Sequence, residues 1–417
     1  MKYTILFIFL GSLFKVSAQG LLMDKEGYSK LEKWTPDENF GYASILPSKI
    51  SYREFAPIPG YQGDVSTCTG WATAYGMLTT QQNILMGITD TMQRTVRSMD
   101  PNFIYQFIRD VDDDSCQNPT LMWDGLDVMV KHGCKPLLTE PFIECNSYEA
   151  FSDNSVSIAS NYKVDEWYGL KMDANPIKGV KEALNSGYIV AVGMDLTNSF
   201  MTGKSVNDGL WNPNEKEDFI GGHAMCVIGY DNFKHGGSFE ILNSYGTAYG
   251  DEGFIWVKYS DFEKFMNQAY IVEISGFQSE GCLYGDCENF GIYKTSEGGL
   301  YEGELKEGLP HARGMHIMSN GDFYVGSFTD GSRDGTGLFY LSSSSTYYAV
   351  VFSNGELVNS QLRQGYASKK LDLELTNNIY SRMSQFIPGK LITDEKQSLK
   401  DLQDYLDESA EGMILKK

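Results

Sequence analysis

Apolar and polar positions divide the chain into two patterned regions. Residues 46–276 combine helix-length stretches with short apolar runs separated by glycine-rich turns, which predicts a mixed α and β domain. Two helices and two strands are its clearest elements: residues 70–85, 124–132, 224–230 and 239–242.

A repeat of 23 residues replaces this pattern from residue 281 onward. Positions of several kinds recur at that step: Gly291, Gly314 and Gly337; Tyr301, Tyr324 and Tyr347; Leu305, Phe328 and Val351. Each unit has the pattern of a strand, a turn and a strand, and its aromatic residues are expected to stack between neighbouring hairpins. Residues 282–361 therefore predict a sheet of stacked hairpins, and within the polar tail at 366–417 the stretch 398–413 predicts a C-terminal helix.

The first 18 residues have the features of a signal peptide. A short basic start precedes a mostly apolar run at 4–16, and small residues follow before Gln19. We expect cleavage after Ala18 and export to a secreted or periplasmic location. Residues 19–45 are polar and predict an N-terminal arm or a short propiece.

Composition limits the partners of such an exported chain. The 417 residues include 34 basic and 55 acidic side chains, which gives a net charge of −21. This surface repels phosphate backbones and no basic cluster offsets it, so nucleic acid is not expected as a partner. Beyond the signal peptide no run of about 18 apolar residues occurs, so no transmembrane segment is expected.

Export also changes the interpretation of the seven cysteines. Most thiols pair in an oxidising compartment, but an odd count leaves at least one unpaired. Cys282 and Cys287 lie five residues apart and can close a small loop. Cys134 ends a predicted helix and Cys226 lies in an apolar strand, so both are expected to be buried thiols.

Cys68 is the cysteine whose surroundings favour chemistry. It begins the first predicted helix, where the helix dipole lowers a thiol pKa and favours the thiolate. His223 follows two glycines at the entrance to an apolar strand and is a candidate base. Asn243, after the next strand, is a candidate to orient that imidazole. Gln62 is a candidate oxyanion donor beside the Cys68 N–H.

These residues resemble the active-site motifs of the papain family of cysteine peptidases. The resemblance covers about residues 46–276 and rests on a Gln, five residues and a Cys, then a His before an apolar strand, then Asn-Ser-aromatic-Gly. It implies an α+β, two-lobed papain-like fold in which Cys68 is the nucleophile and His223 the base. It further implies that Asn243 orients the base and that Gln62 stabilises the oxyanion.

The match departs from the family pattern in several places. Thr69 follows the nucleophile where an aromatic is usual, Val65 stands at a usual cysteine, and Tyr245 replaces the customary Trp. Residues 19–45 are too few for the long inhibitory prodomain of many members. These departures remove no catalytic atom, but they place the chain in a divergent branch.

The 23-residue units resemble MORN repeats over residues 282–359, with a third unit that has lost its core glycines. This resemblance implies a single-layer sheet that serves in binding or as a spacer, so a protein partner is expected there. The papain resemblance implies, in addition, a disulfide between Cys116 and Cys145.

The sequence therefore predicts a secreted cysteine endopeptidase or other peptidase that acts on peptides or unfolded proteins, without a cofactor or a metal. Two alternatives stay open: a catalytically silent papain-fold protein that binds or adheres through its repeats, and a Cys-His acyltransferase. Because the repeats supply no candidate nucleophile, base or oxyanion donor, a chain ending near Gly276 is expected to retain peptide hydrolysis.

Overall fold

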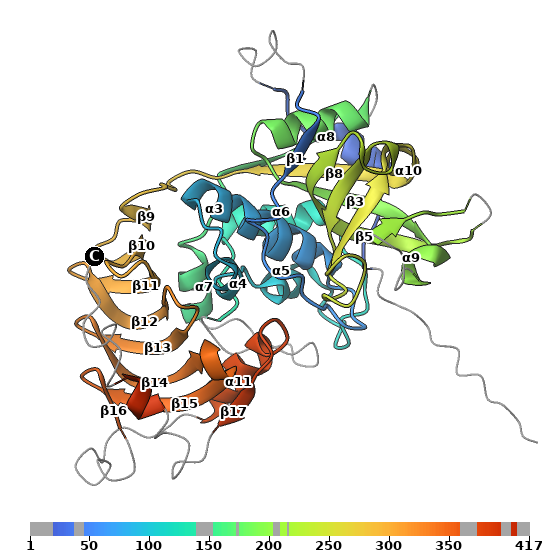
Figure 1. Cartoon of the computed structure of the whole chain (residues 1–417). Coiled ribbons are helices and arrows are strands. Elements are labelled where there is room, and N and C mark those ends of the chain that lie inside the picture. Colours follow the sequence, from blue (N-terminus) through green and yellow to red (C-terminus); the bar gives the residue numbers. More distant parts are fainter. Residues whose placement is uncertain are drawn as a thin grey trace, which may run out of the picture.

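The computed structural model describes residues 20–36, 46–138, 153–171, 175–202, 209–214, 217–358, 373–392 and 402–406. A part built of helices and strands is followed by a long antiparallel sheet, and Figure 1 shows this sheet curving beside the helices. The predicted signal peptide at 1–18 and Cys145 lie outside the described residues. Within these ranges no helix combines the length and the apolar character needed to cross a membrane.

One long helix begins at the predicted nucleophile and runs through what we call the helical lobe. It consists of α2 (Cys68–Gly70), a π-helical segment η2 (Trp71–Leu78) and α3 (Thr79–Met86), and it ends at Gly87, whose φ of 64° reverses the chain. The side chains of η2 are all buried, which explains why this stretch is apolar on every side. The predicted helix at 70–85 is thus confirmed.

The remaining helices of this lobe are shorter. Asp90 and Asp100 accept hydrogen bonds from backbone N–H groups at the first turns of α4 and α5, and Gly133, with φ of 84°, follows α6. The predicted helix at 124–132 is confirmed as α6. Their bounds are α4 (Thr91–Val96), α5 (Pro101–Ile108), α6 (Met122–Lys131) and α7 (Asp153–Ala159), whereas α1 (Lys25–Lys30) packs against the sheet of the other lobe.

An eight-stranded sheet with flanking helices forms the sheet lobe. Its strand order is β2-β8-β3-β5-β6-β7-β4, and β1 pairs with β5. The strands predicted at 224–230 and 239–242 are confirmed as β5 and β6. The bounds are β1 (Lys49–Ser51), β2 (Glu166–Gly169), β3 (Val190–Thr197), β4 (Leu210–Trp211), β5 (Phe219–Asp231), β6 (Ser238–Leu242), β7 (Phe254–Lys258) and β8 (Met266–Glu273), with α8 (Pro176–Asn185), α9 (Asn198–Thr202), η4 (Lys234–Gly236) and α10 (Tyr259–Phe265).

Strand β5 separates two cores because successive side chains of a strand point to opposite faces. Ala224 and Cys226 belong to the core that contains the long helix. Met225 and Val227 belong to a second core, which α8 and α10 complete. β5 is therefore apolar on both faces after His223, and by the same alternation the imidazole lies on the face of Met225 and Val227.

The C-terminal region is a nine-stranded sheet whose neighbours follow one another from β9 to β16, with β17 parallel to β15. One face of this sheet shares a hydrophobic core with the helical lobe, because residues such as Leu300, Ile317 and Phe323 pack in the same cluster as Leu78 and Met99. The bounds are β9 (Cys282–Gly285), β10 (Phe290–Lys294), β11 (Leu300–Lys306), β12 (Leu309–Ile317), β13 (Phe323–Thr329), β14 (Ser332–Leu341), η5 (Ser342–Ser344), β15 (Thr346–Ser353), β16 (Glu356–Leu357) and β17 (Lys390–Ile392).

The repeated tyrosines explain the repeated glycines. A Cβ on Gly314 would lie 2.3 Å from the hydroxyl of Tyr301, and a Cβ on Gly326 would lie 2.3 Å from the hydroxyl of Tyr324. Each ring therefore lies over strand backbone that only glycine leaves accessible. The family name of these repeats stays a prediction, whereas the antiparallel sheet is observed.

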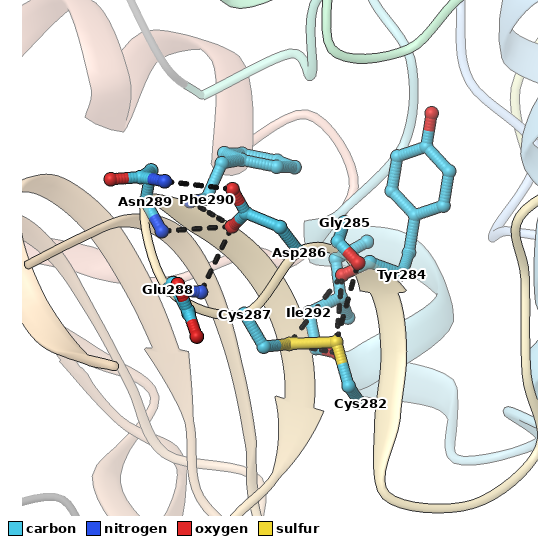
Figure 2. The surroundings of a disulfide bond; sticks show 9 residues. All are labelled: Cys282, Tyr284, Gly285, Asp286, Cys287, Glu288, Asn289, Phe290 and Ile292. Carbon is cyan, nitrogen blue, oxygen red and sulfur yellow. Dashed lines mark hydrogen bonds between the residues drawn. A yellow bond between two sulfur atoms is a disulfide. The ribbon is translucent and has the colours of Figure 1, made fainter. Parts of the chain in front are cut away.

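Cys282 and Cys287 form the predicted disulfide at the start of this sheet, at the point in the chain where the two lobes end and the repeats begin. Figure 2 shows the bond beside Asp286, whose carboxylate accepts hydrogen bonds from the backbone N–H groups of Glu288 and Asn289. The turn between β9 and β10 is thus closed by a covalent bond and by a side-chain cap.

The C-terminal tail contains two elements that the sequence pattern did not predict. Helix α11 (Leu373–Met383) lies on the side of the sheet that faces the helical lobe, and β17 adds a parallel strand at β15 (Figure 1). Residues 402–406 are helical, within the stretch for which a terminal helix is predicted.

Candidate active site

Cys68 lies at the first residue of the long helix and its side chain is fully buried. Backbone hydrogen bonds from Ala224, the residue after His223, and from Gly20 reach its thiol. Burial is the larger effect, and it raises the pKa of the Cys68 thiol to about 11. The helix N-terminus alone predicts the opposite direction, so the sequence-based expectation of a lowered pKa is wrong for this arrangement.

His223 and Asn243 are paired as the sequence predicts. The imidazole Nε2 lies 2.9 Å from the Asn243 Oδ1. Because an amide oxygen only accepts, Nε2 carries the hydrogen and Nδ1 is left as the acceptor. Nδ1 is buried and makes no hydrogen bond to any described residue. The ring of Tyr245 covers the imidazole, with ring centres 5.0 Å apart.

Burial also decides the charge of this imidazole. It lowers the pKa of His223 to about 4, although the hydrogen bond to Asn243 acts in the opposite direction. At neutral pH both Cys68 and His223 are therefore uncharged in this conformation. A thiolate–imidazolium pair requires that water or substrate reach the two groups.

Gln62 is held by the residue that follows Asn243. Its Oε1 accepts a hydrogen bond from Ser244 Oγ at 2.5 Å, and its Nε2 donates to the Val65 carbonyl at 2.8 Å. The backbone N–H of Gln62 also donates to the Ser244 carbonyl. An amide Nε2 has two hydrogens, so one remains for an oxyanion.

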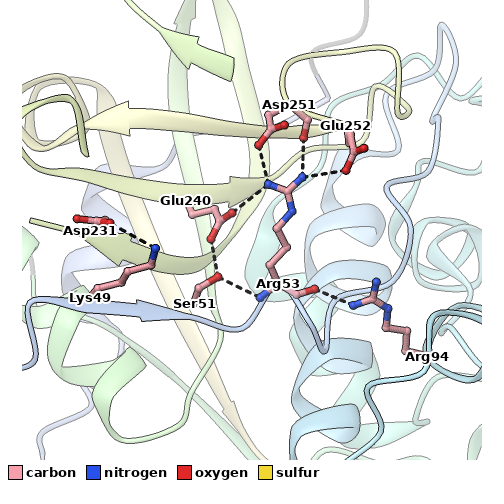
Figure 3. Close-up of polar contacts among 8 residues, drawn as sticks. All are labelled: Lys49, Ser51, Arg53, Arg94, Asp231, Glu240, Asp251 and Glu252. Atoms are coloured by element: carbon pink, nitrogen blue, oxygen red, sulfur yellow. Dashed lines mark hydrogen bonds and ion pairs between the residues drawn. The ribbon is translucent and has the colours of Figure 1, made fainter. Parts of the chain in front are cut away.

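The cluster around Arg53 fixes the loop that follows Asn243 (Figure 3). The guanidinium donates to the Asp251 carboxylate at 2.6 Å and to its carbonyl at 3.1 Å, and it forms an ion pair with buried Glu240. Two residues later the carbonyl of Gly253 accepts the Asn243 N–H. The charged network thus supports the residue that orients the base.

Residues 20–23, which we call the inter-lobe segment, pass beside the nucleophile. The Leu21 N–H donates to the Gly222 carbonyl in the sheet lobe. Leu22 N–H donates to the Thr120 carbonyl in the helical lobe, and Thr120 N–H donates back to Gly20. The segment thus forms backbone hydrogen bonds with both lobes on either side of Cys68, as a bound peptide does.

Glycines make room for this segment. A Cβ on Gly193 would lie 2.6 Å from a Leu21 methyl carbon, and a Cβ on Gly222 would lie 2.7 Å from the Leu21 carbonyl oxygen. Gly20 approaches the backbone of Ser66 so closely that its own Cβ would lie 2.1 Å from the Ser66 oxygen. Leu21 is almost fully buried, with 5% of its surface exposed to solvent. Sequence patterns gave no signal for this contact, because a polar arm has no periodicity.

The other cysteines behave largely as expected. Cys134 and Cys226 are free and buried. Cys116 is disulfide-bonded, and its predicted partner Cys145 lies outside the described residues. In the acidic run at 112–114, Asp113 is buried and caps backbone N–H groups of its own loop. Within the described ranges no group of three or more His, Cys, Asp or Glu side chains is arranged to hold a metal ion.

Comparison with known proteins finds similarity to cysteine peptidases. The family model for papain family cysteine protease matches residues 109–273, a stretch that includes His223 and Asn243 and begins after Cys68. An uncharacterized peptidase C1-like protein of Acanthamoeba polyphaga mimivirus is 30% identical over 113 residues, which is 27% of this chain and 35% of that protein. The chain thus spans about a third of the length of this relative.

Among solved structures, Xylellain, a cysteine protease from Xylella fastidiosa, superposes with a TM-score of 0.52 at 22% identity. The superposition covers 63% of this chain and 97% of Xylellain, so the lobes share its fold and the C-terminal sheet is additional. Residues 109–273 therefore match the cysteine peptidase domain of the papain family.

Proposed function

We propose that this chain is an exported cysteine peptidase that hydrolyses peptide bonds with Cys68, His223, Asn243 and Gln62. The observation that carries the proposal is the hydrogen bond between His223 and Asn243, which leaves a buried, unpartnered Nδ1 on the residue before Ala224, whose backbone contacts the Cys68 thiol. That orientation is the one a base needs in order to accept a thiol proton.

The chemistry follows in two halves. Nδ1 of His223 takes the Cys68 proton, the thiolate attacks the scissile carbonyl, and the oxyanion is held by Gln62 Nε2–H and the Cys68 N–H. The imidazolium then protonates the leaving amine, and a thioester remains on Cys68. His223 next takes a proton from a water molecule, and the resulting hydroxide attacks the thioester carbonyl and expels the Cys68 thiolate. The imidazolium then returns its proton to that thiolate.

The conformation described here is a latent one in this proposal. The inter-lobe segment lies against Cys68 and hydrogen-bonds to both lobes, and burial leaves the nucleophile and the base uncharged. A substrate backbone needs the same Gly222 and Thr120 groups, so catalysis requires the segment to leave. Because the Leu21 side chain occupies the space above Gly193, a peptide with a large apolar residue is expected to bind there in its place.

Export is supported by the Cys282–Cys287 disulfide, since such bonds persist in oxidising compartments. Antibody or mass detection of the chain outside the cytoplasm, with an N-terminus at Gln19, tests it. Binding of a protein partner by the C-terminal sheet remains a proposal of its own, for which a pull-down with residues of the sheet changed is the measurement.

The decisive experiment compares Cys68→Ala with Cys134→Ala, which removes an equally buried thiol from the same lobe. Both are assayed on fluorogenic peptides, in the wild-type and the Leu21→Ala background. Loss of hydrolysis only in Cys68→Ala supports the proposal. Equal hydrolysis in both variants overturns it. Amine incorporation into a glutamine peptide that exceeds hydrolysis identifies the acyltransferase alternative, and absence of both reactions identifies the silent binding protein.

A further inference from the structure

We infer that Phe386, in the turn after α11, is a positioning residue for catalysis, and that the C-terminal region is a built-in support of the nucleophile and the oxyanion donor. The inference rests on the proposed function of Cys68 and Gln62. It adds a residue more than 300 positions away from the nucleophile, in a segment that carries no catalytic group.

Phe386 packs against the face of the long helix directly after Cys68. Its ring stacks on Tyr75 with centres 5.4 Å apart and planes 17° apart, and it lies 6.3 Å from the ring of Trp71. All three side chains are at least nine-tenths buried. Trp71 and Tyr75 lie one and two turns beyond Cys68, so the helix surface that Phe386 covers is the one nearest the nucleophile.

The same ring also contacts the segment that leads to Gln62. A Cβ on Gly60 would lie 2.5 Å from Phe386 and 2.2 Å from Trp71, so the chain passes here only because residue 60 is glycine. The Gly60 carbonyl accepts the Gly246 N–H at 2.8 Å, beside the pairing of Gln62 with Ser244. Phe386 therefore touches both the helix that carries Cys68 and the backbone that carries Gln62.

The tail that carries Phe386 is itself firmly attached. Arg382 donates to the Leu137 carbonyl and lies 3.5 Å from the buried Asp100 carboxylate. Burial would raise the pKa of Asp100, but the charges of Lys135 and Arg382 outweigh it and lower that pKa. The ion pairs are thus formed across the neutral range, and they hold α11 against the helical lobe.

On its other side the tail is fastened to the repeats. The hydroxyls of Tyr301 and Tyr324 each donate to the carbonyl three residues later in their own unit. In the third unit the Tyr347 hydroxyl instead donates to the Ile387 carbonyl, one residue after Phe386. The third repeat, which has lost its core glycines, is therefore the unit that receives the tail.

From these contacts we expect a chain ending near Gly276 to lose activity, contrary to the expectation from the sequence alone. Without the sheet and α11, the Phe386 ring that packs against Gly60, Trp71 and Tyr75 is lost. The reacting groups must be held within about 0.5 Å for full activity, and a displacement of 1 Å costs about 100-fold. Loss of Phe386 lets the helix and the Gln62 backbone shift relative to each other.

The test uses the full chain and the series Phe386→Leu and Phe386→Ala, with Phe339→Ala as the matched control. Phe339 is a fully buried aromatic residue of the C-terminal sheet, and it lies on the face away from the helical lobe. All are measured in the Leu21→Ala background at a temperature where near-ultraviolet circular dichroism shows each to be folded. If Phe386→Ala does not fold, Phe386→Val takes its place.

We expect kcat to fall about 10- to 100-fold in Phe386→Ala, with KM changed less than about twofold, and to recover to within about threefold in Phe386→Leu. A peptide aldehyde, whose oxygen occupies the oxyanion site, should bind more weakly by the same factor as kcat falls. Iodoacetamide labelling of Cys68, which needs no oxyanion donor, should stay within about threefold.

Equal kcat in Phe386→Ala and Phe339→Ala, or a loss that appears only in KM, overturns the inference. So does a loss in Phe386→Leu as large as that in Phe386→Ala, because a side chain of similar volume should still hold the two backbones. Failure of the proposed function is distinguished separately, since it appears as hydrolysis that persists in Cys68→Ala.

Discussion

Replacing Leu21 by Ala is the most direct way to test whether the inter-lobe segment keeps the peptidase latent. The substitution keeps the backbone hydrogen bonds to Gly222 and Thr120 and removes only the side chain that packs above Gly193. We expect the segment to be displaced more often and the rate of peptide hydrolysis to rise.

The magnitude follows from burial. Leu21 retains 5% of its exposure, and burial of a leucine side chain contributes roughly 1.5–3 kcal/mol, of which the change to Ala removes about 2 kcal/mol. Since 1.4 kcal/mol is a factor of ten, the ratio of closed to open chains falls about 30-fold. While the closed form predominates, the initial rate rises by the same factor.

Leu22→Ala is the matched control, because Leu22 is the neighbouring residue of the same type but is 44% exposed. It should raise the rate less than about fivefold. Initial rates on a fluorogenic peptide are divided by the concentration of Cys68 titrated with an alkylating epoxide. Equal rates for both variants and wild type, in a chain whose hydrolysis depends on Cys68, would refute the idea that this segment controls access.

Three further predictions follow from individual contacts. In Gly20→Ala the new methyl group collides with the Ser66 backbone, so iodoacetamide should label Cys68 at least about tenfold faster than in wild type, and an unchanged labelling rate contradicts the packing of residue 20. Burial lowers the pKa of His223 to about 4, so as the pH falls below 6.5 this histidine is protonated in the unfolded chain before it is protonated in the folded chain. The free energy of unfolding is therefore at its full value above pH 6.5 and falls by up to about 3 kcal/mol towards pH 4. Urea unfolding of wild type against His223→Gln measures this, since the variant should lose less stability over that interval. Glu302 pairs with Arg97 at 3.1 Å between the sheet and the helical lobe, both buried, so Glu302→Gln should destabilise the chain by about 3–5 kcal/mol in urea unfolding. Glu26→Gln, which breaks the exposed pair with Lys30, should leave the midpoint unchanged.

Local sequence patterns predicted those features that depend on neighbours along the chain. The long helix from Cys68, the strand after His223 and the hairpins at a 23-residue step follow from apolar spacing and glycine position, because helix and strand periods are properties of short segments. The Cys282–Cys287 bond was predictable because five residues bring two thiols within reach in a single turn.

The candidate site was predictable as a set of residue types in order, but not as an electrostatic environment. A helix N-terminus lowers a thiol pKa, and the sequence carries that information at Cys68. Burial raises the same pKa to about 11, and burial depends on how distant segments of the chain pack around the thiol. The larger of the two effects was therefore invisible to local patterns.

Contacts between distant segments were decided only by the tertiary structure. The sequence by itself determined that 19–45 is polar and that the tail is unlike the repeats, yet nothing in either pattern places Leu21 beside Gly222 or Phe386 beside Tyr75. The pairing of Arg97 with Glu302 likewise joins residues 205 positions apart. Such contacts depend on how the lobes and the sheet share one core, and the free energy that selects them is a property of the packed whole rather than of any segment.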